Sequence, residues 1–542
     1  PQEKGCRCWS LKPATGGCAS ADYPSRDNLP MTRSHMPSLS PLTLGISTAR
    51  WGVTHWPLAY ALALAQMFAL ICVATLPAHA APHSKAVRSE PPKHTAGDIG
   101  QLPPEVQAAL QRAKVPSDNF HVMVVDTHAS STPRLSHQAQ VRVNPASLMK
   151  LATTTAALDT LGPAFVWRTP VYVDGTVRDG VLQGNVYIKG SGDPRLVVER
   201  LWLLMRRIQG LGIHKIQGDI VLDRSAFEVP PRDAASFDGE PLRPYNAAPD
   251  ALLLNFKSLL IQFVPDRAAN VARVQIEPPL AGVQFPATVP LNNGDCSDYR
   301  SALRADWSDP TRIRFAGSFP AVCGEKMWPI AYAAPQQFAQ RAIAGMWQQL
   351  GGQLSGQVRE GNVPAGLQPA FNVESASLAE TIRDINKYSN NVMAQQVFLT
   401  LSQQQREVGS FEASREVMQR WWRERVGGEG PTFDNGSGLS REERISAQAL
   451  ARLLQVAWAS PSMPELMSSL PVTGVDGTMK RSKAQASAHL KTGSLRDVAG
   501  VAGYVDTVSG KRLVVVAILH HANANAARPA LDAMIDWAGK QP

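Results

Sequence analysis

The amino-acid sequence predicts an α+β fold, in which an antiparallel sheet is flanked by helices and interrupted by a large β-rich insertion of two subdomains. The C-terminal segment HLKTGSLRDVAGVAGYVDTVSGKRLVVVAILHHA contains three consecutive strand-like runs, and VSGK forms the turn between the last two. Helical periodicity surrounds this segment, whereas residues 167–335 alternate short apolar runs with Gly and Asp turns. Strands joined by tight turns form an antiparallel sheet, and helices must cover its faces.

Residues 1–80 are predicted to be a leader and a signal peptide. The uncharged run WPLAYALALAQMFALICVATL follows basic residues and precedes Ala78-His79-Ala80, an Ala-x-Ala cleavage site. The run is also long enough to span a membrane, so a permanent anchor is the alternative. In both cases the bulk of the chain is expected to be exported to the periplasm, with a loose membrane association left open.

The charge balance restricts the partners only weakly. Lys and Arg number 54 and Asp and Glu 45, which gives a net charge of +9. This balance suits an anionic polymer or a membrane surface, and a solvated surface with a slight excess of cations explains it equally well. It leaves open a weak association with the membrane or with another envelope protein. The sequence contains no basic run with interleaved aromatic residues, so nucleic acid is not an expected partner.

The first elements after the signal peptide are a linker, a strand and a helix. Residues 81–105 are polar and proline-rich, as linkers are. The run HVMVVDTHA, His121–Ala129, predicts a strand. In the next segment, VRVNPASLMKLATTTAALDTL, Asn144 is a good N-cap and Pro145 suits the first helical position. Gly162 and the proline after it end this helix.

The insertion, residues 167–335, contains strand-like runs and one helical piece at 196–209. After signal cleavage only Cys296 and Cys323 remain, and an exported chain meets an oxidising compartment. These two cysteines are a disulfide candidate, worth about 2–4 kcal/mol if unstrained, with two free thiols as the alternative. We expect no metal site, because no HExxH or CxxC pattern is present.

The domain that carries the C-terminal sheet is predicted to consist of residues 106–166 and, after the insertion, residues 336–542. Helical periodicity in this second part predicts helices over residues 336–349, 377–402, 410–425, 446–458 and 526–537.

A serine and a lysine three residues apart, Ser147 and Lys150, lie at the start of the helix that follows Asn144. At this spacing both side chains share one helix face. The helix N-terminus favours a developing alkoxide, and the same positive end together with burial lowers the pKa of a lysine. A neutral lysine can then accept the serine proton and activate the nucleophile.

Two further motifs supply the polar partners that such a lysine needs. Ser389-Asn390-Asn391 lies in a helical segment, and Lys491-Thr492-Gly493 begins a strand. Taken singly, each motif fits an ordinary helix cap, polar helix face or strand entry. The combination of S-x-x-K, S-x-N and K-T-G in this order is typical of β-lactamases and penicillin-binding proteins.

The chain resembles the D-alanyl-D-alanine carboxypeptidases and D,D-endopeptidases of the penicillin-binding-protein-4 type, class C of the low-molecular-mass group. Beyond the three motifs, the resemblance extends over GNVYIKGSGDP, IQGDIVLDRSAF, PYNAAPDALLLNF, NGSGLSR and GVDGTMKRS. It implies a β-lactamase/transpeptidase-like catalytic domain with a nested insertion. It also implies action on peptidoglycan stem peptides and cross-links, acylation by β-lactam antibiotics, and no cofactor.

The resemblance also implies a role for each motif residue. Ser147 would be the acylated nucleophile and Lys150 its proton acceptor, while Ser389 would relay a proton to the leaving amine. Asn391 would orient Lys150 and the substrate amide. Substrate-binding roles fall to the K-T-G segment: Lys491 and Thr492 would bind the terminal carboxylate, Gly493 would leave room for the substrate, and the N–H groups of Ser147 and Ser494 would form the oxyanion hole.

Two alternatives remain at the level of the sequence. One is a serine β-lactamase, which carries the same three motifs. The other is a non-catalytic envelope protein that only binds peptidoglycan. Because all motif residues are present, the enzyme is favoured.

Overall fold

The computed structural model describes residues 99–128 and 131–542, so the expected signal peptide and most of the linker lie outside the described residues. A five-stranded antiparallel sheet has the order β2-β1-β25-β24-β23. It combines both ends of the described chain, because β1 pairs with β25 along its whole length. The strand bounds are β1 Phe120–Asp126, β2 Leu135–His137, β23 Ala488–Ser494, β24 Val498–Asp506 and β25 Arg512–His520. The three predicted C-terminal strands are therefore present, and β23 is an edge strand.

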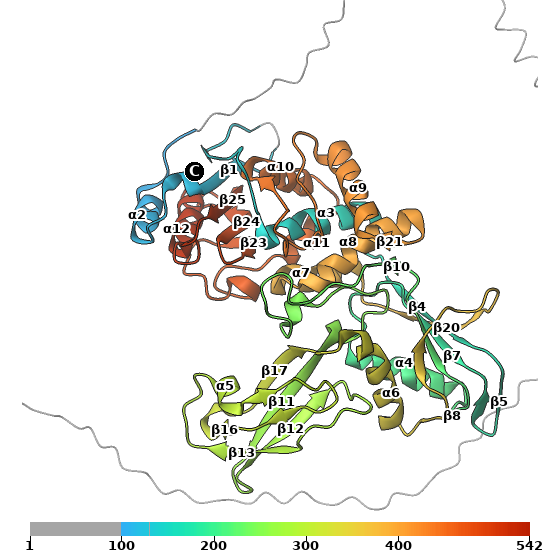
Figure 1. Ribbon diagram of the computed structural model, residues 1–542. Helices are drawn as coiled ribbons and strands as arrows, with labels where there is room; N and C mark the ends of the chain where they lie inside the picture. The colour runs from blue at the N-terminus through green and yellow to red at the C-terminus, as the bar shows by residue number, and fades with distance from the viewer. Residues whose placement is uncertain (1–98, 129–130) are drawn as a thin grey trace, which may run out of the picture. The chain divides into compact units, whose positions relative to one another are not determined.

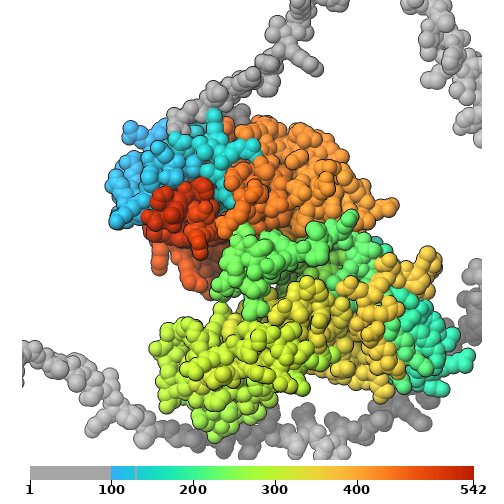
Figure 2. Space-filling view, in the orientation of Figure 1, coloured from blue at the N-terminus to red at the C-terminus, as the bar shows by residue number. Residues whose placement is uncertain are grey.

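Helices cover both faces of this sheet (Figure 1). On one face, α2 (Pro104–Arg112) packs against α12 (Arg528–Gly539), and in Figure 2 the blue and red segments form one continuous surface. On the other face, α10 (Ala447–Trp458) packs on β25 and β1. Successive residues of β25 alternate between the two apolar cores that result, which explains why this strand is apolar at nearly every position.

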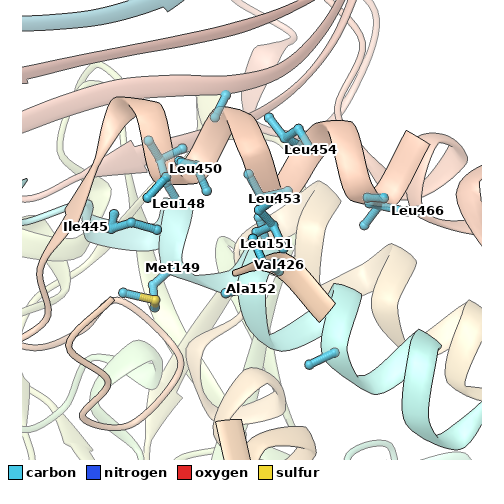
Figure 3. Packing of buried hydrophobic residues seen from close by; sticks show 14 of the residues in the cluster. Leu148, Met149, Leu151, Ala152, Val426, Ile445, Leu450, Leu453, Leu454 and Leu466 are labelled. Atoms are coloured by element: carbon cyan, nitrogen blue, oxygen red, sulfur yellow. The ribbon is translucent and has the colours of Figure 1, made fainter. Parts of the chain in front are cut away.

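Behind α10, a layer of helices encloses α3 (Met149–Leu161). Figure 3 shows Leu148 and Leu151 packing toward Leu450 and Leu453 of α10. The remaining helices of this layer are α7 Leu378–Tyr388, α8 Asn391–Arg406, α9 Phe411–Trp421 with a π turn over Trp422–Val426, and α11 Met463–Ser469.

The inserted region forms sheets of its own, together with α4 (Val198–Gly210) and α5 (Tyr299–Leu303). One sheet has the order β19-β9-β7-β4-β20, with bounds Val358–Glu360, Ile220–Asp223, Val186–Lys189, Arg168–Val173 and Pro369–Glu374. A second has the order β18-β8-β6-β5, with bounds Gln353–Leu354, Lys215–Ile216, Val181–Gln183 and Thr176–Arg178. A third has the order β16-β13-β12-β11-β17, with bounds Phe319–Pro320, Thr288–Asn292, Val271–Glu277, Ser258–Asp266 and Lys326–Ala331.

The structure places the end of the insertion later than residue 335, where the sequence analysis placed it. Helix α6 (Phe338–Gln349) buries its apolar face in the core of the inserted sheets. After it, β20 pairs with β4, the first strand of the insertion. The chain returns to the central helices only at α7. Helical periodicity shows that a face is buried, but it does not show which sheet buries it.

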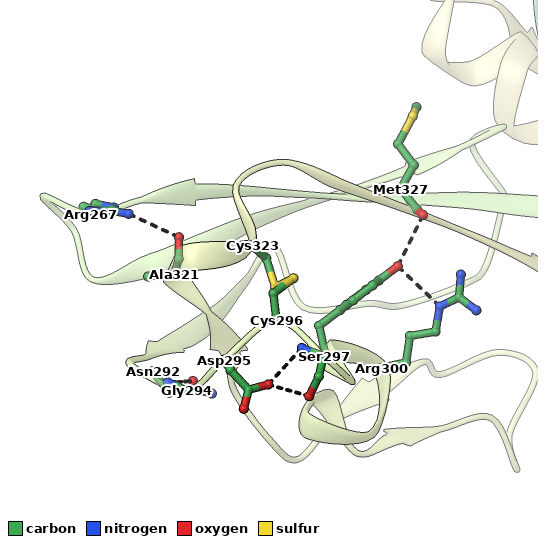
Figure 4. Close-up of a disulfide and its surroundings, with 11 residues drawn as sticks. Arg267, Asn292, Gly294, Asp295, Cys296, Ser297, Arg300, Ala321, Cys323 and Met327 are labelled. Atoms are coloured by element: carbon green, nitrogen blue, oxygen red, sulfur yellow. Dashed lines mark hydrogen bonds between the residues drawn. A yellow bond between two sulfur atoms is a disulfide. The ribbon is translucent and has the colours of Figure 1, made fainter. Parts of the chain in front are cut away.

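A disulfide joins Cys296 and Cys323 in the connections beside the third inserted sheet, with the Cα atoms 5.0 Å apart (Figure 4). It fixes the segment before α5 to the short turn that follows β16. Within the described part of the chain, no helix is both long and apolar enough to cross a membrane.

Candidate active site

Ser147 lies in a tight turn of 3-10 helix, Ala146–Leu148, which leads directly into α3. Pro145 is the N-cap of this turn, so the sequence analysis placed the cap one residue too early at Asn144. Asn144 instead braces the approach to the turn, because its Oδ1 accepts the N–H of Ala146 at 2.8 Å. Ala146 has a φ of +48°, which is uncommon for a residue with a side chain. The turn also packs tightly on Gly438, where a Cβ would come within 2.0 Å of the Ala146 carbonyl oxygen. These constraints fix the direction of the Ser147 side chain, which remains partly exposed.

Lys150 is fully buried beside Ser147. Its Nζ donates to Ser147 Oγ at 2.9 Å, to Asn391 Oδ1 at 2.6 Å and to the Ser437 carbonyl oxygen. All three acceptors are formally neutral. Burial lowers the pKa of Lys150 to about 7, against the opposing charge of Glu443. A large fraction of this amine is therefore unprotonated at neutral pH.

The break between α7 and α8 positions the second motif. Ser389 ends α7 with a φ of +57°, and Asn390 caps α8 by accepting the N–H of Met393. As the first residue of α8, Asn391 reaches Lys150 with its oxygen, while its Nδ2 donates to the Tyr245 carbonyl oxygen at 3.1 Å. The sequence predicted one helical stretch over 377–402, and the cap inside it is what brings Asn391 to the lysine.

The third motif lies on the edge strand β23. Lys491 is fully buried, and its Nζ donates to Ser389 Oγ at 2.8 Å and to the Thr492 carbonyl oxygen at 2.8 Å. Burial and the nearby Lys150 lower the pKa of Lys491 well below its usual value. A Cβ on Gly493 would come within 2.7 Å of the Pro145 carbonyl oxygen, so only glycine lets the strand lie against the serine turn.

The structure thus brings the three motifs together in two hydrogen-bonded groups that meet at the Ser389–Asn391 segment. One runs from Ser147 through Lys150 to Asn391, and in the other Ser389 is joined to Lys491. Ser494 lies on the same strand, but its side chain is exposed and its hydroxyl accepts from Arg528 at 2.6 Å. Cys296 and Cys323 lie in connections beside the third inserted sheet, outside this cluster.

One contributor that the motifs do not reveal is the loop over residues 434–443. Its Ser437 carbonyl is the third acceptor for Lys150. The fully buried Glu443 holds the loop, since its Oε1 accepts the N–H groups of Asp434, Asn435 and Gly436. Burial raises the pKa of Glu443 to about 7. The two glycines of NGSG, both with positive φ, were the signal for a tight loop, but nothing in the sequence linked it to Lys150.

The insertion also reaches the site. The Tyr245 carbonyl that binds Asn391 belongs to a short turn, Pro244–Asn246, of the inserted region. Gln396 of α8 makes the second connection, donating to the carbonyl oxygens of Gly192 and Asp250. The insertion therefore contributes to the position of α8, which carries Asn391.

Comparison with known proteins identifies the family of this chain. Residues 102–541 match the model of the D-Ala-D-Ala carboxypeptidase 3 (S13) family. The chain belongs to the S13 family. It is similar to D-alanyl-D-alanine carboxypeptidase DacB of Haemophilus influenzae, with 25% identity over 395 residues, 69% of this chain and 80% of that protein. It is also similar to the D-alanyl-D-alanine carboxypeptidase of Actinomadura sp. strain R39, with 27% identity over 444 residues, 76% of this chain and 80% of that protein.

A solved structure supports the fold. The crystal structure of penicillin binding protein 4 from Haemophilus influenzae matches with a TM-score of 0.64 at 21% identity, covering 80% of this chain and 99% of the other. The predicted α+β fold class and the predicted family are confirmed. Membership of the S13 family also confirms the predicted enzyme class, a serine-type D-Ala-D-Ala carboxypeptidase.

Proposed function

We propose that this S13 enzyme cleaves the D-alanyl bonds of peptidoglycan stem peptides through an acyl-enzyme on Ser147. The observation that carries the proposal is the set of neutral partners around Lys150. Because no carboxylate is hydrogen-bonded to this buried amine, it can lose its proton near neutral pH and accept the proton of Ser147, 2.9 Å away.

In the acylation step, Ser147 Oγ attacks the carbonyl carbon of the penultimate D-alanine as its proton passes to Lys150. The oxyanion is stabilised by the backbone N–H groups of Ser147 and Ser494. The C–N bond then breaks, Ser389 gives its own proton to the leaving amine, and Ser389 regains a proton from the protonated Lys150. Lys491 holds the Ser389 hydroxyl through a hydrogen bond. Lys491 and Thr492 bind the terminal carboxylate. Water hydrolyses the ester and restores Ser147.

The leaving amine defines the activity. When it is the terminal D-alanine, the reaction is that of a carboxypeptidase, and when it is the side-chain amine of a neighbouring stem peptide, the same step is that of an endopeptidase. A β-lactam presents an equivalent strained amide and acylates Ser147. The related penicillin binding protein 4 of Haemophilus influenzae has been solved in complex with a β-lactam. Peptidoglycan places the reaction in the periplasm, the compartment that the N-terminal region predicts.

Labelling with a fluorescent penicillin tests the nucleophile. We expect stoichiometric labelling of the wild type, none of Ser147→Ala, and full labelling of Ser468→Ala, an exposed serine of α11. Labelling of Ser147→Ala would disprove the assignment. Fast turnover of nitrocefin by the wild type would instead indicate a β-lactamase.

Digestion of purified peptidoglycan tests the substrate. Mass analysis of the products should show loss of terminal D-alanine, conversion of cross-linked dimers to monomers, or both. If neither product forms while penicillin still binds, the chain is a binding protein rather than a hydrolase of peptidoglycan.

A further inference from the structure

The segment 472–482, which ends in GVDGTMKRS, lies beside the K-T-G strand and has no role in the mechanism above. It contains a turn of 3-10 helix, Gly477–Met479, which packs against β23. A β-bridge between Val472 and His489 fixes its start to the same strand. The segment is therefore held at the edge where substrate is proposed to lie.

A largely buried ion pair connects this segment to the helix before Ser389. Lys387 of α7 has a side chain that is 5% exposed, and its Nζ lies 2.6 Å from Asp476 Oδ2. The other carboxylate oxygen of Asp476 accepts the N–H of Val472 at 2.9 Å. With both oxygens engaged, the carboxylate has one geometry, and the segment keeps a fixed position relative to the Ser389 turn.

Two neighbours of Thr478 restrict its backbone further. Gly477 has a φ of +52°, and a Cβ there would come within 2.5 Å of the Lys387 carbonyl oxygen. Met479 is buried in the core beneath the sheet. Between these anchors Thr478 is exposed, and its Oγ1 accepts a hydrogen bond from Thr492 Oγ1 at 2.8 Å.

The direction of this hydrogen bond leaves one proton available. Thr492 donates to Thr478, and among the described residues the hydroxyl proton of Thr478 has no acceptor. Lys491, the neighbour of Thr492, has its Nζ on the Thr492 carbonyl oxygen and on Ser389. At this end of the cleft the hydroxyl proton of Thr478 is therefore the free donor, and Thr492 can turn its own proton from Thr478 to a bound carboxylate, because a hydroxyl group rotates.

We propose that Thr478 donates a hydrogen bond to the terminal carboxylate of the substrate, together with Thr492, and so contributes to selection of peptides with a free C-terminus. This inference rests on the proposed function. Hydrogen bonds to charged groups are stronger than neutral ones, and removing a partner of such a bond is expected to cost roughly tenfold to a hundredfold in binding.

The test compares two substrates, an N-acylated D-Ala-D-Ala peptide and its C-terminal amide, on three variants. Thr478→Val keeps the shape and removes the hydroxyl, and Thr478→Ser keeps the hydroxyl. Thr473→Val removes a hydroxyl of the same segment that instead donates to the Ala486 carbonyl oxygen and accepts the N–H of Ala488. For the carboxylate substrate, we expect Thr478→Val to raise KM about tenfold or more and Thr478→Ser to stay near wild type. For the amide, Thr478→Val should stay within about twofold.

Either of two results with Thr478→Val would overturn the proposal: an unchanged KM for the carboxylate substrate, or an equal rise in KM for both substrates, which would indicate a purely structural role. A rise in KM for the carboxylate substrate alone in Thr473→Val would also overturn it, because the effect would then come from the segment as a whole rather than from the Thr478 hydroxyl. The proposed function is tested independently by D-alanine release and by penicillin labelling of the wild type.

Discussion

The cleft and the insertion each shield a lysine from solvent, and they do so in opposite ways. In the cleft, the partners of Lys150 are a hydroxyl, an amide oxygen and a backbone carbonyl. In the insertion, Lys257 precedes β11 with a side chain that is 13% exposed and lies 2.9 Å from Asp250 Oδ2. Arg224 approaches the same carboxylate oxygen at 3.3 Å.

The difference separates a catalytic lysine from a structural one. A buried cation is costly unless an opposite charge compensates it. Asp250 supplies that charge to Lys257, so the pair connects two segments of the insertion. Around Lys150 the acceptors are neutral, so burial lowers the pKa to about 7 instead. The same residue type thus gives an ion pair in one place and a proton acceptor in the other.

Replacing Lys150 by Met should produce the largest effect. Ser147 would remain, but without its base we expect acylation by penicillin to slow by about 10²–10⁴-fold. The measurement is the second-order rate of labelling by fluorescent penicillin. An acylation rate within a few fold of wild type would show that Lys150 is not the base that activates Ser147. Its chemical role would then not differ from that of Lys257.

Lys257→Met should show the reverse pattern. Removing one partner of a buried ion pair typically costs 3–5 kcal/mol, and we expect about 3 kcal/mol because Arg224 still faces Asp250. Urea unfolding measures this loss, and penicillin labelling of the folded protein should be unchanged. The double variant with Asp250→Asn should recover part of the stability. A loss of labelling with intact stability would contradict the structural role.

The fold could be predicted where the pattern of apolar residues showed which faces of an element are buried. β25 is apolar throughout because each of its faces packs in a different core. The VSGK turn before it correctly predicted that β25 pairs with the preceding strand, β24. The 336–349 helix shows the limit: its periodicity was correct, but the sheet that covers it is set by the pairing of β20 with β4 across about 200 residues.

The site could be predicted where side chains carry the chemistry. Ser147, Lys150 and Asn391 stand in recognisable motifs, and the structure brings them within hydrogen-bonding distance. The carbonyl groups of Ser437 and Tyr245 could not be found, because every residue has a carbonyl and only the fold selects which one reaches the cleft. Glu443 was missed for a related reason, since no motif marks a carboxylate that binds backbone N–H groups.

The fall of kcat/KM at acid pH, the acid limb of the pH profile, should report the titration of Lys150. The pKa of Lys150 is lowered to about 7, and only the neutral amine accepts a proton. Below pH 7 the protonated form dominates, so kcat/KM should fall about tenfold for each further pH unit and level off above pH 7. The measurement is the rate of D-alanine release from pH 5 to pH 9. A flat profile over pH 5 to 7 would show that Lys150 is not the titrating base.

Glu443→Gln should shift this limb slightly. The charge of Glu443 raises the pKa of Lys150, so its removal should move the acid limb to lower pH. The shift should be a fraction of a unit, because burial raises the pKa of Glu443 itself to about 7 and the carboxyl is mostly neutral on the acid limb. Asp434 also faces Glu443, but it stays in place in the variant. Glutamine keeps an oxygen for the three N–H groups that hold the loop.

The matched control for this variant is Glu442→Gln, one residue earlier and exposed, where solvent screens the charge. It should leave the limb in place. A shift of the Glu443→Gln limb to higher pH would contradict the electrostatic coupling between Glu443 and Lys150. Loss of activity at all pH values would assign Glu443 to the loop alone, because a displaced Ser437 carbonyl would change the position of the amine rather than its pKa.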